Sequence, residues 1–140
     1  MIDPAKEPIR YAAEIVGTDP FARTLGISID EVRDSYTRVS LIIKDEHCNS
    51  EVRAHGSVLF AIADQALAVA ANSRGYKAFS LETKINYFQG VKPGAVVVAE
   101  ATPLDIRNRV SLWNIELRTD KGERIALAQG LAYHLVSQKD

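Results

Sequence analysis

Two polar residues interrupt an otherwise apolar stretch of this sequence. Residues 58–71 comprise 14 positions, and only Asp64 and Gln65 among them are polar. Aspartate is a poor helix former, and burying an unpaired carboxylate is costly unless the group becomes neutral. A carboxylate kept in such a stretch therefore indicates a chemical role. The alternative is an Asp64 that faces solvent or pairs with an arginine, and this pattern alone allows both.

The residues before the apolar stretch, His55, Gly56 and Ser57, are suited to the start of a helix. A helix N-terminus presents free backbone N–H groups and the positive end of the helix dipole. A glycine there lets a substrate approach the backbone without a side chain in the way. Such a site can polarise a carbonyl group and hold the oxyanion that forms when the carbonyl is attacked.

The apolar stretch itself predicts one long helix over residues 57–73. It is rich in alanine and leucine, contains no internal glycine or proline, and is followed by Gly75, where a helix C-terminus is expected. The N-terminal residues 7–16 have apolar residues at helical spacing, which Gly17 can end, and residues 19–26 predict a short turn or helix.

The rest of the chain predicts strands, two before the long helix and four after it. The segment TDKGE, residues 119–123, is a strong hairpin signal, and GVKPG, residues 90–94, is a turn. The predicted strands cover residues 27–34, 36–43, 78–88, 95–107, 109–118 and 124–136.

One face of the last predicted strand carries only small residues, namely Ala126, Ala128, Gly130 and Ala132. Such a face suggests close approach by the alanine-rich helix. A helix that is apolar almost all round must be enclosed, and an antiparallel sheet that curls around it meets that need. The prediction is a single α+β domain over residues 1–140, a hotdog fold in outline, with residues 1–26 as an N-terminal helical segment. Periodicity alone also allows other α+β arrangements.

Composition bounds the function further. The chain has 140 residues, 46% hydrophobic and 25% charged, with a net charge of −1, and it lacks the basic surplus of a nucleic-acid-binding protein. The single cysteine, Cys48, excludes an internal disulfide and fits a reducing, cytoplasmic location. The N-terminus has no signal-peptide pattern, and residues 58–71 are too few to span a bilayer, so no membrane is expected.

A longer pattern covers roughly residues 20–136 and resembles a known family. After Asn49 come AHGSVLFAIADQALAVAAN and, later, KINYFQGVKPG. This order is similar to that of the PaaI-type (phenylacetic acid degradation) hotdog acyl-CoA thioesterases, in which an Asn precedes His-Gly-Gly and an Asp follows eight residues after the first glycine. The resemblance implies hydrolysis of acyl-CoA, with coenzyme A as part of the substrate, no other cofactor and no metal. It also implies a homodimer that further pairs into a dimer of dimers.

The resemblance assigns roles to five positions. Asp64 is similar to the carboxylate that activates water or attacks the thioester, and Gly56 to the residue whose backbone N–H forms the oxyanion hole. His55 and Asn49 match polar residues that shape the loop and orient the thioester. Ser80 matches a position where some relatives hold the attacking water with a hydroxyl, although a strand serine is usually only a surface hydroxyl.

The sequence departs from the family pattern at two positions. Ser57 replaces the second glycine, and Val52 stands where a glycine is common three residues before the histidine. Ser57 suits a first helical turn and leaves the Gly56 amide available. Val52 reduces the backbone freedom of the loop. Neither change removes a reacting group, so both bear on the substrate more than on the reaction.

A polar cluster is the candidate for the coenzyme A phosphates, because the planar fork of arginine matches phosphate. The alternative is a solvated turn. The cluster consists of Arg107, Asn108 and Arg109 at a strand junction, with Lys84 and Asn86 on an earlier strand.

Other interpretations of single residues remain. His55 is also compatible with a purely structural role, and Cys48 as a nucleophile would need a base and a positive environment. His47, Cys48 and His55 lie close in sequence, but no second Cys/His pair completes a metal site. His134 is expected at the surface or at an interface.

Two other functions compete with hydrolysis. A hotdog dehydratase or hydratase would normally pair a histidine with a carboxylate in a different motif. A non-catalytic acyl-CoA-binding or regulatory hotdog protein gains little from Asp64 near a thioester.

Helix geometry predicts that one chain cannot supply both reacting groups. Asp64 lies eight residues beyond Gly56, which corresponds to about 80° and roughly 12 Å on a helix. A side chain as short as aspartate cannot cover that distance. The amide and the carboxylate that serve one thioester should therefore come from different subunits across a twofold axis.

Overall fold

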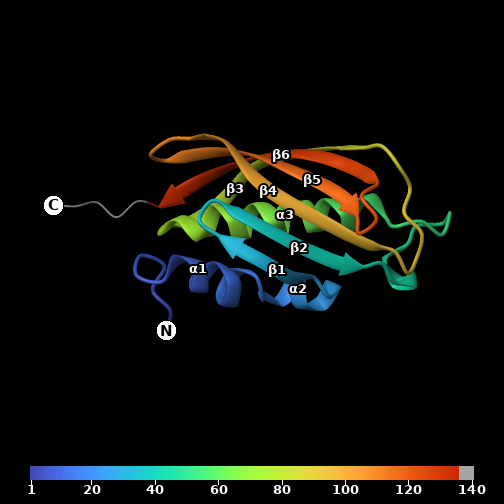
Figure 1. The fold of residues 1–140 in the computed structure, drawn as a ribbon, viewed down its shortest axis with the longest axis horizontal. Helices are drawn as coiled ribbons and strands as arrows, with labels where there is room; N and C mark the ends of the chain where they lie inside the picture. The colour runs from blue at the N-terminus through green and yellow to red at the C-terminus, as the bar shows by residue number, and fades with distance from the viewer. Residues whose placement is uncertain (136–140) are drawn as a thin grey trace.

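Six antiparallel strands form one sheet around a single long helix in the computed structural model, which describes residues 1–135 (Figure 1). The helix is α3 (Gly56–Ala71), and the order of strands across the sheet is β1-β2-β4-β5-β6-β3. The strands are β1 (Ser28–Arg33), β2 (Tyr36–Ile42), β3 (Lys77–Tyr87), β4 (Val96–Ile106), β5 (Val110–Thr119) and β6 (Arg124–Leu135).

The predicted elements are confirmed to within one or two residues, apart from residue 136, which lies outside the described residues. The helix predicted over residues 57–73 begins at Gly56 and continues beyond Ala71 as the 3₁₀-helix η3 (Asn72–Arg74). The TDKGE turn joins β5 to β6, as expected. Residues 88–95 do not form a hairpin, because β3 lies at an edge of the sheet and β4 lies between β2 and β5.

The central helix is enclosed as its composition predicts. Ten of its 16 residues are buried, and the small-residue face of β6 lies against it. A Cβ atom added to Gly130 would lie 2.5 Å from Leu67 Cδ2, so any larger residue would force the Leu67 side chain to shift. The segment Gly56–Arg74 is long and apolar enough to cross a membrane, but 61% of its apolar window is buried within the fold, as expected of a core helix.

The N-terminal segment covers the side of α3 that the sheet leaves open. It consists of α1 (Pro8–Tyr11), the π-helix η1 (Ala12–Val16) and α2 (Pro20–Leu25) (Figure 1, blue). The prediction of a helix over residues 7–16 is confirmed, although its second half is a π-helix. Gln65 Nε2 donates a hydrogen bond of 2.8 Å to the Val16 carbonyl oxygen and thereby ties η1 to α3.

A buried polar network occupies one end of the sheet, and it corrects the expectation that His134 lies at the surface. The His134 side chain is only 2% exposed. Trp113 Nε1 donates to Ser111 Oγ at 2.6 Å, and Ser111 Oγ lies 2.6 Å from His134 Nε2. The indole N–H can only donate, so the serine hydroxyl accepts from it and keeps its own proton for a hydrogen bond to a neutral imidazole. The odd–even alternation of β6 turns His134 inward, on the same face as Gly130.

We expect His134 to make stability depend on pH below neutrality. Burial, reinforced by the Arg74 charge, lowers the pKa of His134 below its ordinary value of 6.5. The native histidine therefore stays neutral while the unfolded chain takes up a proton. The free energy of unfolding should be unaffected above about pH 6.5 and should fall as the pH decreases below it.

His134→Gln, which keeps an acceptor for Ser111, should reduce this slope by at most about 1.4 kcal/mol per pH unit, the limit for one proton. Urea unfolding of both proteins at pH 5 and pH 7 measures the slope. Identical slopes in the two proteins would contradict the assignment.

Candidate active site

The loop before α3 is held by side chains that bond its own backbone. Nδ1 of the buried His47 accepts a hydrogen bond of 3.0 Å from the Lys44 N–H, and the His47 carbonyl accepts one of 2.8 Å from the His55 N–H. Asn49 Oδ1 accepts from the N–H groups of Glu51 (2.9 Å) and Arg53 (3.2 Å). Asn49 therefore bonds the backbone of the loop, and His47 does so as well, although the sequence had not indicated His47 as an anchor.

Val52 lies at the tip of this loop in a left-handed conformation, with φ at 56°. Valine rarely adopts this conformation, because its branched Cβ collides with the backbone. The common glycine at this position has no such cost. The replacement of the family glycine by Val52 therefore introduces local backbone strain.

The helix N-terminus leaves one backbone donor free. His55 is the N-cap, and its Nδ1 accepts a hydrogen bond of 3.0 Å from the Ser57 N–H, while the next two N–H groups, of Val58 and Leu59, bond the His55 carbonyl. Within residues 1–135 the Gly56 N–H donates to no acceptor. A substrate carbonyl can therefore accept from this amide at the positive end of the helix dipole.

Tyr87 contacts the same end of the helix and was not predicted. Its hydroxyl donates a hydrogen bond of 2.8 Å to the Gly56 carbonyl oxygen, and a Cβ on Gly56 would lie 3.3 Å from the tyrosine ring. Glycine at position 56 thus makes room for Tyr87 as well as for a substrate. Burial raises the pKa of Tyr87, so its hydroxyl remains a donor at neutral pH. The alternation of β3, with Ile85 packed against the core, could have indicated that Tyr87 points inward.

Asp64 lies midway along α3 and faces β3. Its Oδ1 accepts hydrogen bonds from Ser80 Oγ at 3.2 Å and from Thr83 Oγ1 at 3.4 Å. Asp64 is half-buried, and within the described part of the chain no donor contacts Oδ2. The arrangement leaves one carboxylate oxygen oriented by hydroxyls and the other available to accept a proton.

A β-bulge lets both hydroxyls reach the carboxylate. Ser80 and Thr83 are three residues apart, so in a regular strand their side chains would point to opposite faces. The pairing of β3 with β6 shifts between Ser80 and Glu82, which leaves Leu81 as an extra residue. The bulge turns Ser80 and Thr83 to the same face. Thr83 could not be recognised from the sequence, because simple alternation places it opposite Ser80.

Gly56 and Asp64 lie far apart in one chain. Tyr87 contacts Gly56 and Thr83 contacts Asp64, and these two residues of β3 are four positions apart. Four residues of strand span about 13 Å at roughly 3.3 Å per residue, in agreement with the rise of about 12 Å along eight helical residues. The Asp64 carboxylate and the Gly56 amide of one chain are therefore separated by about 12 Å along the helix.

Comparisons with known proteins identify the family. A family model for the thioesterase superfamily matches residues 53–126, more than half of the chain. The chain belongs to the thioesterase superfamily. An Archaeoglobus fulgidus protein named as an esterase is 32% identical to this thioesterase over 117 residues. The aligned residues cover 84% of this chain and 76% of that protein.

Two further proteins share the architecture. The Escherichia coli acyl-coenzyme A thioesterase PaaI is 26% identical over 117 residues, 84% of either chain. The solved structure of E. coli PaaI aligns with 96% of this chain and 97% of its own, with a TM-score of 0.88 at 23% identity. A hypothetical thioesterase protein of Streptococcus pneumoniae, solved with coenzyme A, aligns with 81% of this chain and 91% of its own (TM-score 0.75, 19% identity). The predictions of a PaaI-type hotdog fold and of a thioester hydrolase are confirmed.

The residues expected at the coenzyme A phosphates do not form one cluster in this thioesterase. Lys84 and Asn86 lie on β3 on the face opposite Thr83, and Lys84 Nζ donates to Asn86 Oδ1 at 3.3 Å. The other three residues, Arg107, Asn108 and Arg109, lie in the exposed β4–β5 turn. This turn is at the same end of the sheet as the first residues of β3. Arg107 is already paired with Asp105 at 2.9 Å.

The histidines of the loop are engaged with the backbone. Nδ1 of His47 and Nδ1 of His55 each accept an N–H group, and Cys48 Sγ lies 3.5 Å from the Lys44 carbonyl oxygen. Among residues 1–135 no three His, Cys, Asp or Glu side chains are grouped as metal ligands would be. His47, Cys48 and His55 therefore all take part in the hydrogen bonding of the loop.

Val52→Gly should stabilise the thioesterase. The substitution removes a left-handed conformation worth about 1–2 kcal/mol and adds about 0.5–1 kcal/mol of backbone entropy in the unfolded chain. The side chain is exposed, so little apolar contact is lost. We expect the free energy of unfolding to rise by about 0.5–1 kcal/mol, measured by urea denaturation.

Val32→Gly, in strand β1, is the control and should destabilise, because glycine weakens a strand. A loss of stability in both variants would show that the loop conformation carries no strain.

Proposed function

We propose that this thioesterase hydrolyses acyl-CoA thioesters, with Asp64 of one subunit as general base and the Gly56 amide of a second subunit as oxyanion hole. The observation that carries the proposal is the Asp64 carboxylate, whose Oδ1 is oriented by two hydroxyls and whose Oδ2 is left available. The name of the E. coli relative and the coenzyme A in the S. pneumoniae structure support acyl-CoA as the substrate.

The proposed reaction uses one water molecule. The water oxygen attacks the thioester carbon while Oδ2 of Asp64 removes a proton from the water. Ser80 Oγ accepts a hydrogen bond from the same water. The carbonyl becomes an oxyanion held by the Gly56 N–H. Collapse of this intermediate breaks the C–S bond, and the proton on Asp64 passes to the coenzyme A thiolate. Direct attack by Asp64, through a mixed anhydride, would use the same residues.

The exposed edge of the sheet supports a homodimer. β3 has a partner, β6, on one side only, and an unpaired strand edge presents free N–H and C=O groups. Large apolar side chains of this strand and the residue after it are half exposed, namely Phe79, Leu81, Tyr87 and Phe88. Antiparallel pairing of β3 with its copy would continue the sheet and cover this edge.

The shared site fixes where the twofold axis must lie. Tyr87 marks the position of Gly56 along β3, and Ser80 and Thr83 mark the position of Asp64. For one subunit to bring its Gly56 to the other's Asp64, Tyr87 must lie opposite the stretch from Ser80 to Thr83. The twofold axis then passes near Lys84, and two equivalent sites result.

The remaining expectations are proposals as well. Coenzyme A enters as part of the substrate, and no further cofactor or metal takes part. Arg107 and Arg109 remain the candidates for its phosphates, now as exposed groups at the end of the sheet. A second association of dimers, and a cytoplasmic location consistent with the single thiol Cys48, complete the proposal.

Asp64→Asn should abolish most of the activity and leave the fold intact. The amide oxygen can still accept from Ser80 and Thr83, but the side chain can no longer take up a proton. We expect turnover to fall by at least about 100-fold, the scale of losing a general base. Hydrolysis of acyl-CoA and thermal unfolding are both measured, with Asp120→Asn, an exposed acid in the β5–β6 turn, as the control. Near-normal turnover of a folded Asp64→Asn protein would remove Asp64 from the mechanism.

Mixing two inactive variants should restore part of the activity. One is Asp64→Asn, and the other is Gly56→Val, whose side chain disturbs the helix start against Tyr87. A heterodimer contains one site in which the intact carboxylate meets the intact amide, so an exchanged mixture should recover up to about a quarter of wild-type activity, since half of the dimers are mixed and each has one of two sites. Subunits with different tags establish that exchange has occurred. Proven heterodimers without activity, or a fully active monomer, would refute the shared site.

A further inference from the structure

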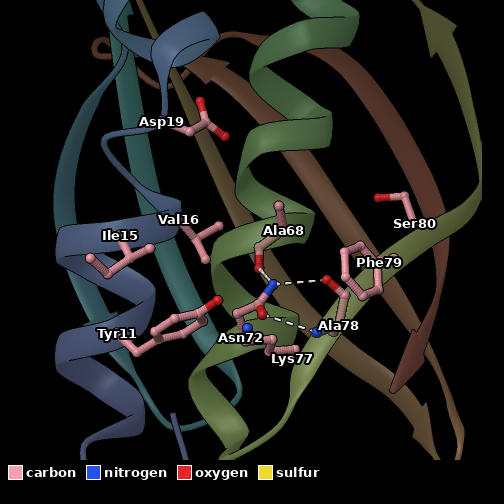
Figure 2. A pocket seen from close by; sticks show the side chains of 10 residues that line it. All are labelled: Tyr11, Ile15, Val16, Asp19, Ala68, Asn72, Lys77, Ala78, Phe79 and Ser80. Carbon is pink, nitrogen blue, oxygen red and sulfur yellow. Dashed lines mark hydrogen bonds between the residues drawn. The ribbon is translucent and has the colours of Figure 1, made fainter. Parts of the chain in front are cut away.

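An open pocket continues from the candidate active site toward the C-terminal end of α3. Its volume is about 340 Å³, near the lower end of ordinary ligand pockets. Figure 2 shows α3 flanked by the N-terminal segment on one side and β3 on the other. The lining residues are mostly apolar; they are Tyr11, Ile15, Val16, Asp19, Ala68, Asn72, Lys77, Ala78, Phe79 and Ser80.

The pocket is continuous with the reacting groups. Ser80, which lines it, donates the hydrogen bond to Asp64 Oδ1. Ala68 lies four residues after Asp64, one turn or about 6 Å further along the same face of the helix, and Asn72 follows after another turn. A thioester whose carbonyl carbon lies at Asp64 can therefore extend its acyl group over Ala68.

The far end of the pocket contains a polar side chain whose hydrogen bonds are already satisfied. Asn72 Nδ2 donates to the carbonyl oxygens of Ala68 at 2.8 Å and Ala78 at 3.1 Å, and Oδ1 accepts from the Ala78 N–H at 3.0 Å (Figure 2). Because this amide bonds α3 to β3 with both its oxygen and its nitrogen, it offers little to a polar ligand. The site is suited to an apolar group.

One wall of the pocket is the N-terminal segment, which lies outside the part of the chain that matches the family model, residues 53–126. Gln65, next to Asp64, holds this wall through its hydrogen bond to the Val16 carbonyl. The Ile15 side chain is 46% exposed and lines the pocket beside Tyr11. Gln65 therefore has a positioning role that accounts for the second polar residue of the apolar helix.

We infer that this pocket binds the acyl group of the substrate and that Ile15, on the wall held by Gln65, limits the length of the acyl groups accepted. The inference rests on the proposed function. The occupant is a linear or aryl acyl group of medium size, since the pocket is small, mostly apolar and reached from the carboxylate.

The test measures binding of S-alkyl-CoA thioethers, which cannot be hydrolysed, by calorimetry with the full chain. The series is S-ethyl-, S-hexyl- and S-decyl-CoA. Ile15→Phe fills the pocket, so S-hexyl-CoA should bind about tenfold more weakly, the scale of overpacking an apolar site. S-ethyl-CoA, which does not reach Ile15, should bind as before. Ile15→Ala should improve binding of S-decyl-CoA relative to S-ethyl-CoA.

Ile9→Phe is the matched control, because Ile9 lies on the same segment but does not line the pocket. It should leave the order of the three affinities unchanged. Equal changes for all three thioethers, or unchanged ratios in both Ile15 variants, would overturn the inference. A changed oligomeric state with unchanged ratios would assign this surface to a second copy of the chain and would overturn it as well.

Hydrolysis of the matching acyl-CoA esters by the wild-type protein is measured in parallel. An inactive wild-type protein would refute the proposed function. The thioether affinities would still show whether the pocket selects ligands by the length of the alkyl chain.

Discussion

The enclosure of one apolar helix by one sheet is the constraint on which the rest of the structure depends. α3 has no polar face wide enough to contact solvent, so its burial supplies much of the apolar area removed from water. The sheet must curl to cover it, and the close contact of Leu67 with Gly130 allows the approach. The sheet leaves two sides of α3 uncovered by its inner strands. One is next to the edge strand β3, and the other is next to the N-terminal segment, which Gln65 holds.

The same constraint determines where chemistry can occur. A carboxylate on the side of α3 that the sheet covers fully would be buried away from water. Asp64 instead faces the edge strand β3 and is only half buried. The bulge at Leu81 adds a second hydroxyl to the one expected there. Gly56 is fixed at the helix N-terminus, where the dipole and the free N–H lie. A straight helix therefore positions both groups and also keeps them apart.

Reaction and selectivity are assigned to different parts of the chain. The helix, its preceding loop and β3 lie within or next to the region that matches the thioesterase family, and they carry the groups proposed to react. The N-terminal segment lies outside that region and contributes a wall of the adjacent pocket. This segment also contributes Ala22 to the hydrophobic core, so its position relative to α3 is fixed by packing as well as by the Gln65 hydrogen bond.

The sequence by itself determined the elements, the enclosed helix and the candidate groups, because these depend on local patterns. Apolar periodicity identified α3 and the strands, the small residues of β6 indicated the helix contact, and the position of Asp64 in an apolar stretch marked it for chemistry. Only the tertiary structure decided the strand order and the role of Thr83. These depend on long-range pairing: β3 crosses to the far edge of the sheet, and one extra residue in its pairing with β6 reverses the face of every side chain after it.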